Sequence, residues 1–137
     1  MNIRFARSIF LVFVLAFVTI AAAPIPPPEP NVTFTLITPL PDTMVIGQSY
    51  TFEVMITSDI PFKSVTARGD YSSRCVVSHG GARSGEGTSA YLTVRWTPKE
   101  STAELPGGVA PVAVDVNVRF HGGVEVSQRY EYNVIVP

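Results

Sequence analysis

The sequence VAVDVNVRFHGGVEV, residues 112–126, carries the clearest structural signal in this chain. Apolar side chains occupy every second position from Val112 to Phe120, and polar side chains stand at positions 115, 117 and 119. A period of two is typical of a β-strand with one buried and one solvated face. His121-Gly122-Gly123 then makes a short connection, and alternation resumes over 124–136. The pattern predicts a β-hairpin made of strands 112–120 and 124–136.

The same alternation recurs upstream of this hairpin, with Met55 as the one apolar exception in an otherwise regular strand. The glycines fall between the alternating segments, where we expect them to mark turns. No segment after residue 23 combines a helical period with a capping signal. The further predicted strands, the shorter ones less regular, are 32–36, 44–46 (a candidate edge segment), 50–57, 62–67, 74–78 and 89–97.

About seven short strands without helices predict one antiparallel β-sandwich over residues 32–137, with a β-barrel as the alternative. Side chains on the apolar side of each strand should form its core. The expected buried residues are Val54, Leu92, Trp96, Val116 and Val118.

Two stretches resemble known modules: GQSYTFEV at 47–54, with a glycine leading into a strand, and the closing strand YEYNVIVP at 130–137. They are similar to the immunoglobulin-like and fibronectin-III-like modules of exported prokaryotic surface proteins. The chain differs from antibody-type domains because it has one cysteine and because its only tryptophan, Trp96, comes late. The resemblance implies an immunoglobulin-like β-sandwich and transfers no functional residue.

Residues 1–23 have the order of a secretory signal peptide. Arg4 and Arg7 precede an apolar run from Ile9 to Ala23 that ends in three alanines. Cleavage after Ala21 or Ala22 is expected, because a later cut would place Pro24 directly after the scissile bond. The alternative is an uncleaved membrane anchor, although fifteen helical residues span only about 22 Å of a hydrocarbon core of about 30 Å. We expect a secreted or cell-surface protein.

Residues 24–31 form a proline-rich spacer in this interpretation. Five prolines between Pro24 and Pro30 favour a stiff polyproline II segment, because proline lacks an N–H and restricts the residue before it. Asn31, the last residue of the spacer, begins the sequence Asn31-Val32-Thr33, which fits an N-glycosylation sequon.

Charge restricts the partners that this chain can be expected to bind. Ten Lys and Arg residues balance eleven Asp and Glu residues, for a net charge of −1, and the cationic residues do not cluster in sequence. Removal of Arg4 and Arg7 would leave a mildly acidic chain. We therefore expect no nucleic-acid partner and no membrane attachment after cleavage. The expected partner is a protein or another envelope component.

Four features could carry chemistry, and each also has a structural interpretation. Arg68-Gly69-Asp70 matches the integrin-recognition tripeptide, but we expect a structural turn after Ala67. Cys75 is expected to be a buried small hydrophobic residue, with an intermolecular disulfide or a catalytic thiol as alternatives. The segment 80–87 is expected to be a flexible glycine-rich loop. Tyr91 should be exposed on the face opposite Trp96, where one aromatic ring makes a poor sugar platform.

Metal binding is not expected. His79 and His121 each precede Gly-Gly, but zinc sites take three or four protein ligands. Three aspartates, Asp42, Asp59 and Asp70, could meet at one end of the sandwich, but calcium prefers a clustered acidic loop. We assign no catalytic, cofactor-binding or metal-binding residue and no cofactor.

The function expected from these observations is that of a non-catalytic, exported interaction module and not an enzyme. One alternative is a surface-filament subunit assembled by strand addition, with Phe34–Ile37 as the donor segment. Another is a ligand- or carbohydrate-binding module. The sequence leaves the oligomeric state open.

Overall fold

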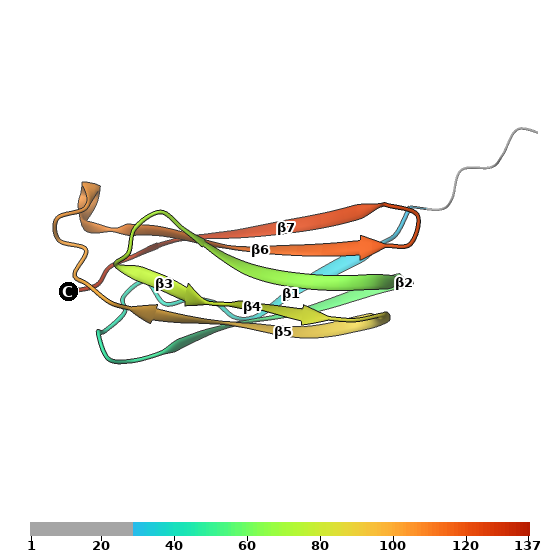
Figure 1. Cartoon of the computed structure of the whole chain (residues 1–137), viewed down its shortest axis with the longest axis horizontal. Helices are drawn as coiled ribbons and strands as arrows, with labels where there is room; N and C mark the ends of the chain where they lie inside the picture. The colour runs from blue at the N-terminus through green and yellow to red at the C-terminus, as the bar shows by residue number, and fades with distance from the viewer. Residues whose placement is uncertain (1–28) are drawn as a thin grey trace, which may run out of the picture.

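The computed structural model describes residues 29–137, and the predicted signal peptide and most of the predicted spacer lie outside the described residues. All pairings between strands are antiparallel, as expected from the sequence. One turn of 3-10 helix covers Pro106–Gly108, and within the described range no helix could cross a membrane. The seven strands (Figure 1) are β1 (Val32–Thr38), β2 (Tyr50–Tyr71), β3 (Val76–His79), β4 (Gly81–Ser84), β5 (Gly87–Pro98), β6 (Ala110–Phe120) and β7 (Glu125–Val134).

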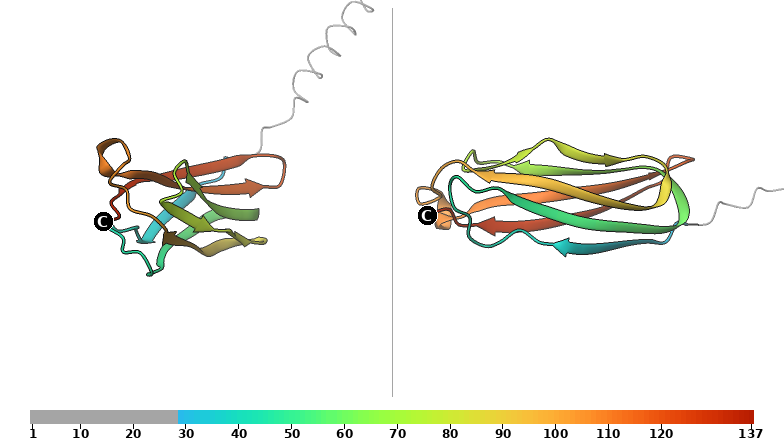
Figure 2. Two further views of the ribbon diagram at one scale, coloured as in Figure 1. Left: turned by 60° about the vertical axis from the view of Figure 1, so that its left-hand side comes forward. Right: turned by 90° about the horizontal axis from the view of Figure 1, so that it is seen from below.

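Strand β2 belongs to both layers of the molecule. Its residues 50–58 pair with β1 and β5, whereas residues 64–71 pair with β6 and β4, and Phe62 between these parts pairs with both β5 and β6. The register shifts between Thr57 and Phe62, and Figure 2 shows the chain turning there, at one end of the molecule, from one layer to the other. Continuity through this corner makes the seven strands formally one folded sheet.

The two layers have an immunoglobulin-like arrangement. One layer has the order β1–β2–β5–β3, and the other has the order β4–β2–β6–β7. These orders correspond to the ABED and CFG sheets of an immunoglobulin domain, with β4 added at the edge of the second sheet. Aromatic contacts join the layers: the ring centroid of Phe52 on β2 lies 5.2 Å from that of Tyr130 on β7. The sandwich expected from the sequence is therefore confirmed.

The core lies between the layers and contains the residues that alternation predicted. Val54, Trp96, Val116 and Val118 have no exposed surface, and Leu92 is 3% exposed. Burying each such side chain contributes about 1.5–3 kcal/mol, so apolar burial is the main stabilising term. Strict alternation thus identified the inner face correctly.

The expectation that glycines mark only turns is wrong at Gly69, which lies inside β2. A Cβ atom at this position would lie 2.2 Å from Ser78 Oγ and 2.8 Å from Trp96 Cζ2. Glycine is therefore required here by the close approach of two neighbouring side chains. At the β6–β7 hairpin the expected turn is confirmed, and Gly122 and Gly123 have φ angles of 92° and 89°.

Two further boundary predictions need correction. The segment 80–87 is not one flexible loop, because residues 81–84 form β4 and pair with residues 65–68 of β2. The candidate edge segment at 44–46 makes no strand. Instead an isolated parallel bridge joins Thr43 to Ile135, and the Met44 N–H donates to the Ile135 carbonyl at 2.9 Å. This bridge ties the segment after β1 to the end of the chain.

Candidate interaction surface

The outward face of the layer β4–β2–β6–β7, which we call the charged face, carries polar side chains in cross-strand rows. Residues 65 and 67 of β2 and residues 116 and 118 of β6 point into the core, so their neighbours point outward. One row contains Arg83, Thr66, Asn117 and Ser127, and the adjacent row contains Gly81, Arg68, Asp115 and Arg129. The rows place charges from four strands on one surface.

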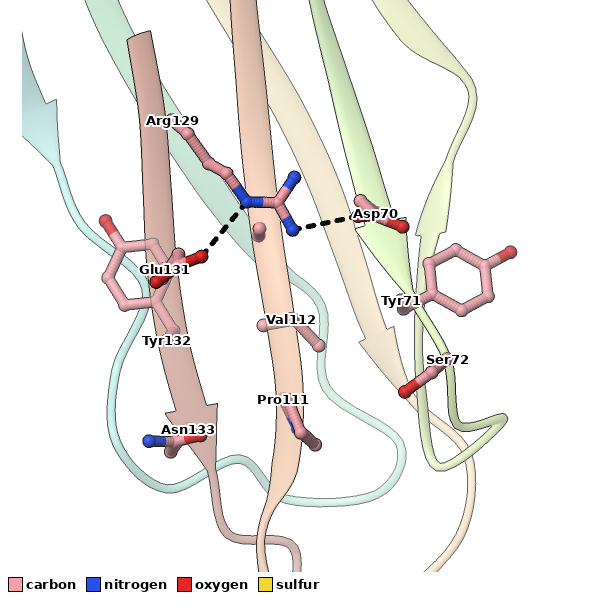
Figure 3. Close-up of a pocket in the computed structure, with 10 residues that line it drawn as sticks. Asp70, Tyr71, Ser72, Pro111, Val112, Arg129, Glu131, Tyr132 and Asn133 are labelled. Carbon is pink, nitrogen blue, oxygen red and sulfur yellow. Dashed lines mark hydrogen bonds and ion pairs between the residues drawn. The ribbon is translucent and has the colours of Figure 1, made fainter.

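Arg129 is the centre of an ion-pair network on this face. Its Nη1 donates to both carboxylate oxygens of Asp115, at 2.9 and 2.8 Å. Its Nη2 donates to Asp70 Oδ2 at 2.9 Å, and its Nε donates to Glu131 Oε1 at 3.1 Å. Figure 3 shows the guanidinium between Asp70 and Glu131. Hydrogen bonds to Asp70, Asp115 and Glu131 raise the pKa of Arg129, so it remains charged at every accessible pH.

A second ion pair joins Arg119 of β6 to Glu125 of β7, with Nε 2.7 Å from Oε1. The four carboxylates of the charged face are therefore each held by an arginine. In contrast, Arg68 and Arg83 form no ion pair with any residue of the described range. The face consequently has two cationic groups whose charge is not compensated by direct contact.

Two open hollows lie on the charged face. One of about 560 Å³ is bordered by Arg68 and Arg83 and by the polar side chains of Ser64, Thr66 and Asn117. The other, of about 580 Å³ and shown in Figure 3, lies around Arg129. Asp70 borders both, so the two hollows are adjacent.

The turn predicted for Arg68-Gly69-Asp70 is wrong. The tripeptide lies in β2 and pairs with residues 113–115 of β6. Glycine and aspartate favour a chain reversal by local propensity. At this site glycine instead allows the strand to pack closely against Ser78 and Trp96, so tertiary packing outweighs turn propensity. Arg68 and Asp70 both project from the charged face, and Asp70 is bound by Arg129.

The buried position predicted for Cys75 is confirmed. The residue is 7% exposed and precedes the fully buried Val76. Its thiol donates a weak hydrogen bond to the Ser101 carbonyl at 3.4 Å. Cys75 therefore packs as a small core residue.

The histidines and aspartates do not form a shared site. His79 Nε2 lies 2.6 Å from Thr97 Oγ1, whereas His121 Nε2 lies 3.1 Å from Glu86 Oε1. The three aspartates are also separated: the Asp59 carboxylate accepts from the Asn31 N–H, the Asp42 carbonyl accepts from the Ile135 N–H, and Asp70 binds Arg129. Within residues 29–137 no three side chains of the metal-binding types His, Cys, Asp and Glu gather.

Tyr91 is exposed, as predicted, with 48% of its surface accessible on the side of β5 opposite the buried Trp96. The nearby Glu53 carboxylate raises the pKa of Tyr91 above its ordinary value. Tyr91 and Glu53 each supply one polar group on the layer β1–β2–β5–β3, which is not the layer that carries the charged face.

The central role of Arg129 could not be inferred from the sequence. Alternation puts Asp115 and Arg129 on the polar sides of two hairpin strands. Their contact depends on the hairpin register, in which they stand directly opposite each other. The contact with Asp70 further requires β2 to lie beside β6, a pairing between residues far apart in the chain.

Comparison with known proteins found no matching family model and no matching curated relative. Among solved structures, the chain is similar to the CARDB domain of a protein from Pyrococcus furiosus, determined in complex with two metal ions. The two share 17% sequence identity with a TM-score of 0.45, and the match covers 80% of this chain and 93% of that one.

Proposed function

We propose that this chain is a non-catalytic, exported module that binds a protein or an envelope component through the charged face. The observation that supports this proposal best is the Arg129 network, which fixes three carboxylates on one exposed surface. Groups held in position before binding lose less conformational freedom when a partner docks. Patterned charges also favour one partner and one register over others.

The environment of the nucleophilic and basic side chains supports a non-catalytic role. The Cys75 thiol is buried and donates to a backbone carbonyl. His79 contacts Thr97 and His121 contacts Glu86, and among the described residues neither histidine forms a hydrogen bond with the Cys75 thiol. Nucleophilic catalysis needs a nucleophile and a base within hydrogen-bond reach.

Site-specific photo-crosslinking tests the proposed function in cells that naturally produce the protein. A photoreactive residue at Ser127 would lie on the charged face, and one at Thr93 would lie on an exposed position of β5 in the other layer. We expect discrete adducts from position 127 and none from the matched control at position 93. Adducts from position 93 alone, or equal adducts from both positions, would contradict the assignment of the charged face.

A second function, self-assembly through β1, is favoured by one observation. Among the described strands β1 pairs with β2 alone, and no charged residue or proline stands within Val32–Thr38 to protect its outer edge. Leu36 and Ile37 are 39% and 48% exposed. The proposed donor segment Phe34–Ile37 lies in this strand, paired with its own domain.

Sedimentation measurements over a range of concentrations test self-assembly through β1. If β1 pairs with another copy, the mass of the wild-type protein should rise with concentration, and Ile37→Lys should keep it monomeric. A wild-type protein that stays monomeric throughout would remove this second function and leave the first unaffected.

A further inference from the structure

We propose that Arg68 and Arg83 form a site for an oxyanion, a phosphate or sulfate ester carried by the binding partner. This inference rests on the proposed function, because it names the chemical group that the charged face would hold. The site is the hollow of about 560 Å³ bordered by both arginines.

The strand register brings the two arginines to the same hollow. Arg83 on β4 stands directly opposite Thr66 on β2. Arg68 follows Thr66 by two residues and so projects from the same face of β2. Side chains opposite or diagonal to each other on neighbouring strands are about 5–8 Å apart at Cβ, a distance that two arginines easily bridge around one anion.

The charges around the hollow favour an anion over a cation. Asp115 stands opposite Arg68, but both of its oxygens already accept from Arg129. Asp70 is likewise held by Arg129. The bordering carboxylates are thus occupied, whereas the guanidinium groups of Arg68 and Arg83 have no ion-pair partner in the part of the chain that the structure describes.

The other groups at the hollow match the needs of a phosphate or sulfate ester. A guanidinium presents a planar fork of N–H donors that binds two oxygens of an oxyanion at once. The Ser64 and Thr66 hydroxyl groups border the same hollow and can donate to further oxygens. The hollow is open and larger than one tetrahedral ion, which leaves room for the rest of the partner.

Titration of the isotope-labelled, purified protein with inorganic phosphate, inorganic sulfate or acetate tests the site, at constant ionic strength. We expect saturable shifts of the side-chain Nε–Hε signals of Arg68 and Arg83 with phosphate or sulfate. Arg68→Ala and Arg83→Ala should each weaken binding about tenfold, because charge-assisted hydrogen bonds are lost. Arg74→Ala, which removes the same charge from an exposed residue that does not border the hollow, should bind like wild type.

The response to each anion shows whether the site prefers a phosphate or a sulfate ester, or whether the proposed anion site is wrong. A stronger response to phosphate indicates a phosphate ester, and a stronger response to sulfate indicates a sulfate ester. Shifts that do not saturate, or an equal loss in Arg74→Ala, would overturn the proposal. Crosslinking from Ser127 without anion binding would overturn this inference alone, whereas anion binding without crosslinking would count against the proposed function.

Discussion

Arg129 on β7 donates from Nη2 to Asp70 Oδ2 on β2 at 2.9 Å, although the two residues are 59 positions apart in the chain. β6 lies between their strands, so the contact crosses the charged face diagonally. It engages the acidic member of the Arg68-Gly69-Asp70 tripeptide in a network within the domain.

This contact gives a new reason to expect no integrin-dependent adhesion. Asp70 is paired within the domain, and the tripeptide is a strand segment, whereas adhesion requires an exposed loop tip. Cell attachment to the immobilised wild-type protein and to Asp70→Glu should be equally low. Strong attachment to the wild type that disappears in the variant would show that the tripeptide is adhesive.

Trp96 should contribute strongly to stability, because its side chain is fully buried between the layers. We expect Trp96→Ala to lower the free energy of unfolding by about 3–5 kcal/mol, as large-to-small core substitutions do. Urea denaturation followed by circular dichroism measures the loss. Tyr91→Ala, at an exposed position of the same strand, is the control and should unfold almost like the wild type.

Gly69→Ala should destabilise the domain because the new Cβ would overlap Ser78 Oγ and the Trp96 ring. Overpacking of this kind costs about 1–3 kcal/mol. Gly85→Ala, where no atom other than those of residues 84–86 lies within 4 Å of the new Cβ, is the matched control and should retain wild-type stability. The double variant Gly69→Ala/Ser78→Gly should recover part of the loss, and failure to recover would locate the strain elsewhere.

Cys75 should resist maleimide in the native protein and react once the chain unfolds, because its side chain is almost wholly buried. Mass spectrometry before and after addition of urea measures the labelling. Cys75→Ser should remain monomeric to the same extent as the wild type. Fast labelling in native buffer, or a wild-type dimer that dithiothreitol dissolves, would contradict a purely structural role.

Export should produce a mature protein that begins at Ala22 or Ala23. The reason is the sequence order of Arg4 and Arg7, the apolar run and the closing alanines. Intact-mass measurement of protein from a secreting host gives the first residue directly. A mass that still includes Arg4 and Arg7 would show that the segment is not cleaved and would favour the membrane-anchor alternative.

The sequence by itself determined the strand faces and the core. Alternation identified Val54, Trp96 and Val116 as buried, because burial on a strand follows a local period of two. The β6–β7 hairpin was equally predictable, because His121-Gly122-Gly123 is a local turn signal. Both properties depend on residues that are neighbours in the chain.

Only the tertiary structure decided which strands meet and what their outward side chains do. Gly69 was predicted to be a turn residue because local propensity contains no information about Ser78 and Trp96, which approach Gly69 from other strands. The network of Arg129 could not be predicted for the same reason. Its contact with Asp70 exists only when β2, β6 and β7 lie side by side in one register. A period of two specifies the face on which a charge lies, but the charge on the neighbouring strand depends on pairing between distant residues.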